Sequence, residues 1–204
     1  GNPPWGSVKN EEKHKDFVKE NIDKISDYQI AQSFVIRAKY FCSNKTECAL
    51  IIASKILYCT EAEKFRKFFN SNYLINRIVE LSIVRKIIFK GAIAPSAILF
   101  FKYLPETDKS KNVVHYISIK PNLFFKLFKL IVIEKLDYKK VLQKQFEKDW
   151  IWKVLLYGNV LDYKFFDYFY SENYDKVRIE DYLKNEDLFY GAGFIIGEKN
   201  RKKA

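Results

Sequence analysis

Short, nearly continuous apolar runs alternate with amphipathic stretches over roughly the first half of the chain, and this alternation most constrains the fold. The run Cys48–Leu57 contains a single charged residue and has the pattern of a strand covered on both faces in a parallel sheet. Ile75–Leu81 and Ser96–Tyr103 are also strand-like. Asp23–Cys42 has apolar residues at helical spacing, and Glu61–Asn70 opens with acidic residues, as helices do. We therefore predict one half of a doubly wound α/β sheet.

The character of the chain changes after residue 105. Glu106–Asn112 is polar and is a candidate linker, so we predict a first domain over residues 1–106 and a mainly helical region over residues 107–204. Val113–Ile119 has the pattern of one more strand. Three later segments rich in aromatic or apolar residues and lysine are expected to be helical: Asn122–Lys135, Tyr138–Leu156 and Leu161–Tyr170.

Composition indicates a folded and basic chain. Lys and Arg outnumber Asp and Glu by 36 to 25, and the net charge of +11 favours a polyanionic partner, with a lysine-rich solvated surface as the alternative. The longest apolar run, near Leu123–Ile133, is interrupted by lysines and is too short to span a bilayer, so we expect a cytoplasmic protein with no membrane partner. The three cysteines lack CxxC spacing and predict neither a disulfide framework nor a zinc site.

The chain opens on Gly1–Gly6 (GNPPWG), whose residue types suit one kind of chemistry. An exocyclic amino group on a nucleobase is a poor nucleophile, because its nitrogen lone pair is delocalised into the ring. Two acceptors that take both N–H hydrogens make this lone pair more available, and the candidates are the Asn2 side-chain oxygen and the Pro3 main-chain carbonyl. A proline pair between glycines is also an ordinary turn, which is the structural alternative.

The other residues of this segment add rigidity and a surface for stacking. Pro3 and Pro4 fix φ and remove N–H groups that would compete for the same acceptors. Trp5 offers a flat face to an extruded base, and such stacking is worth about 1–3 kcal/mol, which offsets part of the cost of unstacking. We therefore predict that Asn2, Pro3, Pro4 and Trp5 form a cradle for a flipped base.

The motif resembles the catalytic motif of adenine-N6 DNA methyltransferases, particularly the large ones of restriction and phage-defence systems. By this resemblance Phe89 is the second residue that contacts the target base. Glutamine-directed methyltransferases share an Asn-Pro-Pro-aromatic core and act on an amide nitrogen, so the choice of substrate depends on the downstream segments. Those segments follow the family's order and spacing: Gln32–Ala38, Ala49–Ser54, Phe65–Phe68, Ile78–Leu81 and Phe89–Leu99.

The resemblance implies a site-specific enzyme that transfers a methyl group from S-adenosylmethionine to adenine N6 in double-stranded DNA, with restriction or specificity subunits as partners. It also implies that the α/β part is the C-terminal half of a Rossmann-like methyltransferase sheet, with the main donor-binding motif upstream of Gly1. The chain lacks methionine, and we expect it to be part of a longer protein and inactive alone. The alternative is a non-catalytic basic module for nucleic-acid binding or assembly.

Other candidate motifs have structural interpretations. His14 and His115 have no partner at triad or metal-ligand spacing, so we predict no catalytic histidine and no metal site. Gly191–Gly197 (GAGFIIG) lacks the spacing and context of a phosphate loop and is interpreted as a bend. The aromatic series Phe165–Tyr170 is expected to pack mainly in the core, with stacking on DNA as the alternative.

Overall fold

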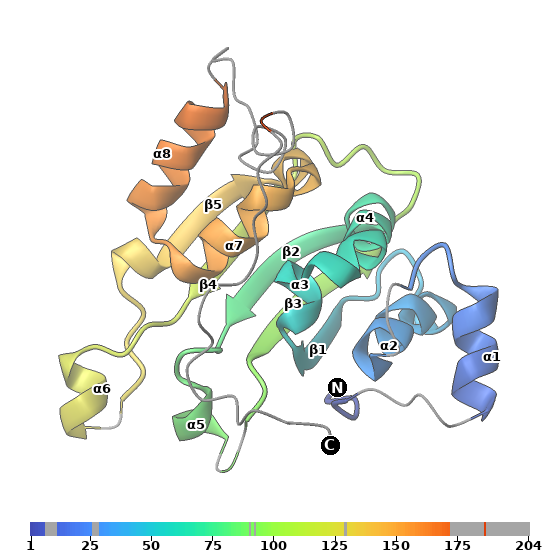
Figure 1. Ribbon diagram of the computed structural model, residues 1–204, viewed down its shortest axis with the longest axis horizontal. Coiled ribbons are helices and arrows are strands. Elements are labelled where there is room, and N and C mark those ends of the chain that lie inside the picture. The colour runs from blue at the N-terminus through green and yellow to red at the C-terminus, as the bar shows by residue number, and fades with distance from the viewer. Residues whose placement is uncertain are drawn as a thin grey trace. The chain divides into compact units, whose positions relative to one another are not determined.

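The computed structural model describes residues 1–6, 12–25, 29–89, 91, 93–128, 130–171 and 186, and in these residues it contains a five-stranded sheet (Figure 1). The spatial order of the strands is β1-β3-β2-β4-β5. The chain divides into two compact units, residues 1–167 and 168–204, and the sheet belongs wholly to the first. The strands are β1 (Cys48–Ala53), β2 (Tyr73–Glu80), β3 (Ser96–Tyr103), β4 (Val113–Ser118) and β5 (Tyr138–Leu142).

Three strands run in the same direction, so their last residues lie at the same edge of the sheet. β3 runs antiparallel to both β1 and β2, and β4 runs parallel to β2. β1, β2 and β4 therefore share one direction, and their last residues, Ala53, Glu80 and Ser118, lie at what we call the carboxyl edge. β5 pairs antiparallel with β4. This mixed sheet and its helices confirm the prediction of an α/β fold.

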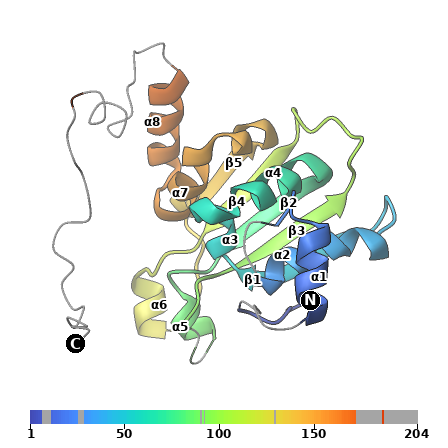
Figure 2. The same ribbon diagram turned by 45° about the vertical axis from the view of Figure 1, so that its right-hand side comes forward.

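Helices flank the strands on both sides of the sheet. α2, α4 and α7 contribute to the main hydrophobic core on one face (Figure 2). No helix in the described part of the chain combines the length and the apolar character needed to cross a membrane. The helices are α1 (Glu12–Glu20), α2 (Ile30–Ala38), α3 (Lys55–Tyr58), α4 (Glu63–Asn72), α5 (Arg85–Ile88), α6 (Leu123–Phe128), α7 (Asp149–Tyr157) and α8 (Val160–Ser171). Short 3-10 helices lie at Lys39–Phe41, Thr60–Ala62, Lys135–Asp137 and Gln143–Glu147.

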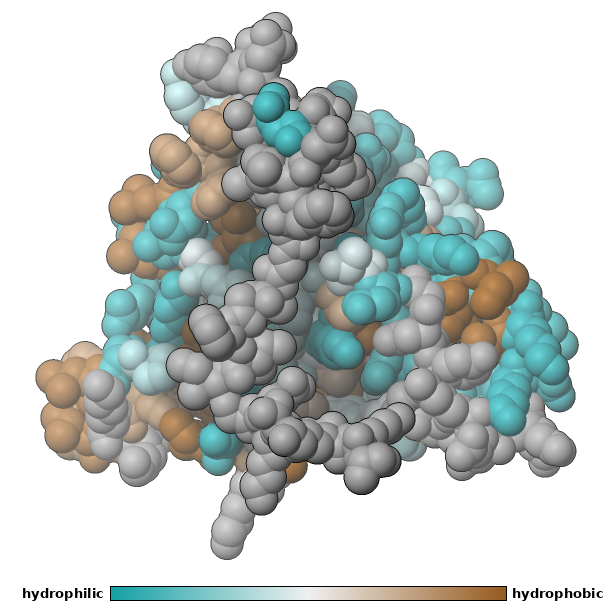
Figure 3. Space-filling view, in the orientation of Figure 1, coloured by the Kyte–Doolittle hydropathy of each residue, from teal (hydrophilic) through white to brown (hydrophobic). Residues whose placement is uncertain are grey.

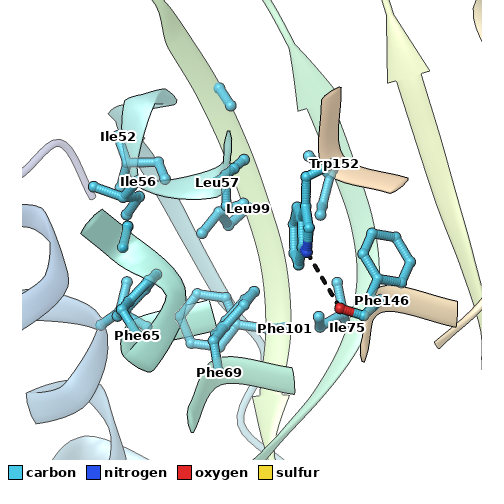
Figure 4. Close-up of a cluster of buried hydrophobic side chains, with 14 of the residues drawn as sticks. Ile52, Ile56, Leu57, Phe65, Phe69, Ile75, Leu99, Phe101, Phe146 and Trp152 are labelled. Carbon is cyan, nitrogen blue, oxygen red and sulfur yellow. Dashed lines mark hydrogen bonds between the residues drawn. The ribbon is translucent and has the colours of Figure 1, made fainter. Parts of the chain in front are cut away.

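An aromatic core fills the space between these helices and the sheet (Figure 4). Phe69 of α4 meets Phe101 of β3 edge to face, with ring centroids 5.4 Å apart, and Tyr73 meets the same ring at 5.0 Å. Trp152 of α7 is buried, and its indole nitrogen donates to the Phe146 carbonyl at 3.2 Å. Such ring pairs are worth about 0.5–1.5 kcal/mol beyond the area they bury, so the abundant aromatic residues stabilise this layer.

A smaller cluster covers the opposite face near the carboxyl edge. Val79, Ile98 and Ile117 alternate along their strands with residues of the main core, so their side chains point the other way. Val84, which precedes α5, and Phe125 of α6 belong to the same cluster. α5 and α6 therefore lie over the carboxyl-edge end of this second face.

The Gln143 side chain forms hydrogen bonds with backbone groups at and beside an irregularity in β2. The register of β2 against β3 shifts between Ile75 and Arg77, which takes backbone groups off the regular ladder. The buried Gln143 side chain accepts from the Ile75 N–H at 3.1 Å and donates to the Asn70 and Tyr73 carbonyls at 2.8 and 2.7 Å. One side chain thus satisfies three backbone groups of a buried region.

Several predicted elements are confirmed by the structure. Ser96–Tyr103 is β3, the predicted strand Ile75–Leu81 largely coincides with β2, and Val113–Ile119 contains β4. The helix predicted over Glu61–Asn70 corresponds to α4, and the one over Leu161–Tyr170 corresponds to α8. The division predicted at residue 106 stays a prediction, and the sheet continues past it through β4 and β5.

The interpretation of Cys48–Leu57 as one strand covered on both faces is wrong. The strand ends at Ala53, and α3 follows after Ser54. β1 lies at the border of the sheet beside an antiparallel neighbour, and only its last two residues are buried. The partner of β1 comes from a distant part of the sequence, so the local apolar pattern does not reveal the direction of pairing.

The prediction of a helix over Tyr138–Leu156 is wrong for the first part of that range, which forms β5. Lys139 and Val141 are fully buried while Lys140 and Leu142 are exposed, so burial alternates with the period of a strand. The sequence does not show this alternation, because a lysine stands at a buried position and lysine side chains usually face solvent.

The segment predicted as a helix over Asn122–Lys135 is helical only as far as Phe128. The residues beyond it include Ile131, Val132 and Ile133, whose β-branched side chains disfavour a helix. Hydrophobic side chains gather on the surface over α6 (Figure 3). The exposed ones in this part of the chain are Leu123, Phe124, Leu127, Phe128, Leu130, Ile131, Val132, Ile133 and Leu136.

Candidate active site

The opening segment begins beside β1, at the outer border of the sheet. The backbone nitrogen of Gly1 donates to the Ala49 carbonyl at 2.6 Å, and the Gly1 carbonyl accepts from the Ile51 N–H at 2.9 Å. This bonding is that of a parallel strand pair. A Cβ atom at Gly1 would lie 3.1 Å from Leu50 Cδ2, so glycine suits the close approach. Residues 2–6 therefore leave the sheet toward its carboxyl edge.

Trp5 is fixed by two contacts that come from different elements. Its indole nitrogen lies 3.4 Å from the Ile51 carbonyl, to which it donates. Its ring meets the Phe89 ring nearly at right angles, with centroids 5.9 Å apart. The Gly6 carbonyl accepts from the Ile30 N–H at 3.1 Å, and Gly6 has a φ of 132°, which glycine adopts without strain. Both ends of the motif are thus held by main-chain groups.

Phe89 is brought to the motif by the short helix α5. Its N–H donates to the Arg85 carbonyl at 2.7 Å, which closes the helix, and its half-buried ring packs against the small cluster near the carboxyl edge. The Arg85 guanidinium donates from Nε to the Ile93 carbonyl at 2.9 Å and from Nη1 to the Ser82 carbonyl, so it ties together the loop on both sides of Phe89.

The five site residues predicted from the sequence meet around one cavity. Its volume is about 360 Å³, and its lining consists of Asn2, Pro3, Pro4, Trp5 and Phe89. This volume lies within the range of about 300–1,000 Å³ that is usual for small-ligand sites. The lining consists of one amide, two proline rings and two aromatic rings, and it therefore suits a flat heterocycle with a polar edge.

Two of the lining residues carry hydrogen-bond acceptors, Asn2 in its side-chain amide and Pro3 in its main-chain carbonyl. Asn2 is exposed, and among the residues that the structure describes its side chain has no hydrogen-bond partner. Pro3 is buried, and a proline has a carbonyl but no N–H. The Asn2 amide is therefore available to a group bound in the cavity.

A buried polar cluster at the carboxyl edge is a feature that the sequence analysis missed. Glu80, the last residue of β2, accepts from the Ser82 N–H at 3.2 Å and from the Ser82 hydroxyl, and lies 3.5 Å from the Tyr116 hydroxyl. The hydroxyls of Ser54 and Ser82 are 2.8 Å apart. Burial raises the pKa of Glu80 to about 7, against the lowering effect of hydrogen bonds from Ser82, Ser54 and Tyr116. These contacts join the ends of β1 and β2 to β4 rather than line the cavity.

The residues given structural interpretations have ordinary partners where the structure describes them. His14 Nε2 lies 3.0 Å from the Ser33 hydroxyl, and His115 Nδ1 bonds the Tyr138 hydroxyl. In the described ranges no three His, Cys, Asp or Glu side chains are placed to hold a metal ion. The prediction that the aromatic series Phe165–Tyr170 packs mainly in the core is wrong: Phe166 stacks on Trp150, but Phe165, Tyr168, Phe169 and Tyr170 are exposed. Gly191–Gly197 lies outside the described residues.

Comparison with known families gives one match in sequence. Residues 1–88 match the family model described as Eco57I restriction-modification methylase. The matched range includes the whole of Gly1–Gly6 and ends one residue before Phe89. No curated protein sequence matches the chain.

Several solved structures resemble the chain at low sequence identity. The modification subunit of a putative type I restriction enzyme from Vibrio vulnificus YJ016 is 15% identical, with a TM-score of 0.48 over 69% of this chain and 32% of that one. The type IIG restriction endonuclease BpuSI is 14% identical, with a TM-score of 0.48 over 76% and 19%. The type I methyltransferase subunit from Streptococcus thermophilus is 13% identical, with a TM-score of 0.43 over 91% and 35%. The chain thus spans about a third or less of these proteins.

Proposed function

We propose that this chain is part of a DNA methyltransferase of a restriction-modification system, the kind of protein whose family model its first 88 residues match. The observation that carries the proposal is the single cavity shared by the opening motif and Phe89, which lie far apart in the sequence. A proline turn with a purely structural role would not require Trp5 and a distant aromatic residue, Phe89, to line the same cavity.

The proposed substrate is the N6 amino group of adenine in double-stranded DNA. The adenine, turned out of the helix, enters the cavity that Trp5 and Phe89 line and contacts both rings. The Asn2 side-chain oxygen and the Pro3 carbonyl accept the two N–H hydrogens, and the amino nitrogen becomes more nucleophilic because its lone pair is less delocalised. The proline pair fixes the backbone that carries the Pro3 carbonyl and follows Asn2, which limits the reorganisation needed during the reaction.

S-adenosylmethionine is the methyl donor that the family resemblance implies. The lining of the cavity holds no carboxylate that would bind the hydroxyls of a donor's ribose, as dinucleotide sites do. The cavity therefore fits the base and not the donor, and we expect the donor to be held by other parts of the whole protein. For the same reason we expect this chain alone to be inactive.

The net charge of +11 supports DNA as the partner, because neutralising phosphates with lysine and arginine supplies most of non-specific binding. Restriction or specificity subunits are the further partners that we propose on the basis of the family match. Binding to DNA should accordingly weaken steeply as salt is raised.

The test is an assay of the full-length protein that contains this chain, with DNA and S-adenosylmethionine carrying a labelled methyl group. We expect Asn2→Ala to lower the rate constant of transfer by about 10²- to 10³-fold, the usual effect of removing one such polar contact. Asn44→Ala is the matched control, because Asn44 is exposed and does not line the cavity. An unchanged rate with Asn2→Ala would refute the assignment of the cradle.

The alternative is a basic module that binds nucleic acid without methyl transfer, which the net charge also favours. The same assay separates the two. DNA binding by the wild-type full-length protein with no labelled product would favour the module and exclude the enzyme.

A further inference from the structure

Cys42 and Cys48 lie next to each other across a short turn. Cys42 follows the 3-10 helix Lys39–Phe41, Cys48 is the first residue of β1, and their Sγ atoms are 3.1 Å apart. The turn between them is held by the Ser43 N–H, which donates to Thr46 Oγ1 at 2.9 Å, and by the Thr46 N–H, which donates to the Ser43 carbonyl at 3.0 Å. The two sulfur atoms need to approach by only about 1 Å to reach disulfide bonding distance.

Both thiols can be reached from solvent. Each of the two cysteines is partly exposed, and both line a cavity of about 700 Å³ whose other walls are mainly apolar, with Phe34 and Leu50 among them. Cys59 is also free, but it does not line this cavity and its thiol bonds the Glu61 carboxylate. A small uncharged oxidant therefore has access to the pair Cys42 and Cys48 together.

The geometry points to a modification site: we propose that hydrogen peroxide converts the thiols of Cys42 and Cys48 into an intramolecular disulfide. The thiolate of Cys42 attacks one peroxide oxygen, the O–O bond breaks, and with one proton the products are a Cys42 sulfenic acid and water. The Cys48 sulfur then attacks the Cys42 sulfur and expels the hydroxyl group as a second water, using the remaining thiol proton. Two electrons pass from the two sulfurs to the peroxide.

The order of the two steps follows from the surroundings of Cys48. Burial, together with the hydrogen bond and the charge of the neighbouring Cys42, raises the pKa of Cys48 to about 12. Cys48 therefore keeps its proton at neutral pH, and Cys42 is assigned the first attack because only a thiolate reacts readily with peroxide. Cys48 acts second, on a sulfur that is already adjacent to it.

The sequence offers a direct assay. Trypsin cleaves after Lys39, Lys45 and Lys55, so Cys42 and Cys48 fall in separate peptides, 40–45 and 46–55, while Cys59 falls in 56–64. We expect non-reducing peptide mapping of the peroxide-treated protein to show 40–45 joined to 46–55, with a loss of about 2 Da that dithiothreitol reverses. Oxidation should also raise the melting temperature by about 5 °C, because the bond closes a loop in the unfolded chain.

Cys59→Ser is the matched control and should leave the joined peptides unchanged, whereas Cys42→Ser should abolish them. The proposal is overturned if peroxide oxidises either cysteine to sulfinic acid without joining 40–45 to 46–55, or if the predominant joined pair includes 56–64. Methyl transfer plays no part in this test, so its outcome is independent of the proposed function.

Discussion

Replacing Glu80 with glutamine should stabilise the protein at alkaline pH and leave it unchanged in acid. Glu80 is 2% exposed, and its partners are the backbone and hydroxyl of Ser82 and the hydroxyl of Tyr116. Glutamine has nearly the same shape and is neutral, and its side-chain oxygen can accept from Ser82 as the carboxylate does. The substitution therefore removes the buried charge while the packing stays the same.

The size of the effect follows from the pKa of Glu80. Burial raises this pKa from an ordinary 4.5 to about 7. At about 1.4 kcal/mol for each pH unit between those values, the charged carboxylate costs the folded state about 3 kcal/mol. Because the folded protein binds the proton more tightly, the contribution of Glu80 to stability is fully present below pH 4.5 and is lost as pH rises through 7. The advantage of Glu80→Gln should therefore grow between pH 4.5 and 7.

Urea denaturation at pH 4.5 and pH 8 measures this difference. We expect Glu80→Gln and the wild type to unfold with equal free energies at pH 4.5, and the variant to be about 3 kcal/mol more stable at pH 8. Glu20→Gln on α1 is the control, because that residue is exposed. If Glu80→Gln is less stable than the wild type by the same amount at both pH values, the hydrogen bonds of Glu80 outweigh the cost of its charge and the reasoning is wrong.

Three further substitutions test the packing. Burial and the charge of Lys120 lower the pKa of Lys139 to about 8, so wild-type stability should rise with pH from 8 toward 10.5, and urea denaturation of Lys139→Met should lack this rise. Gln143→Ala leaves buried backbone groups unpaired and should lower the free energy of unfolding by about 2–4 kcal/mol, against little change for Gln145→Ala. Phe101→Ala should cost about 3–5 kcal/mol, and less is expected for the half-buried Phe100→Ala on the opposite face; equal losses would contradict the assignment of the core.

Strands and helices whose own residues show a clear hydrophobic pattern could be predicted from the sequence. Elements whose burial depends on residues far away in the sequence could not. Ser96–Tyr103 contains three aromatic residues and Ile98, all of which favour a strand, and it forms β3 over the predicted range. β5 could not be predicted because one of its buried positions is Lys139. The amine of Lys139 donates to the Ser118 hydroxyl and to the Leu155 carbonyl. The burial of that lysine depends on β4 and α7, and neither is visible in the local sequence.

The same distinction holds at the carboxyl edge. The acidic residue in the strand Ile75–Leu81 carries no sign of burial, since one carboxylate at a strand end is usually solvated. Its environment is made by Ser54, Ser82 and Tyr116, which come from separate parts of the chain. A sequence pattern could have indicated Glu80 only through the serines that follow β1 and β2, and serine is too common after strands to be a signal.

The residues that line the cavity could be named from the sequence because their types suit one kind of chemistry, whereas Ile51 and Ile30, which hold the motif, contribute main-chain groups. The N–H of Ile51 donates to Gly1 and the carbonyl of Ile51 accepts from Trp5, so one strand residue holds two residues of the motif without using its side chain. The Gly6 carbonyl is likewise held by the Ile30 N–H. Any residue except proline provides both backbone groups that Ile51 provides. The backbone of β1 and of Ile30 therefore positions the motif. Sequence analysis identifies the motif but not the residues that hold it.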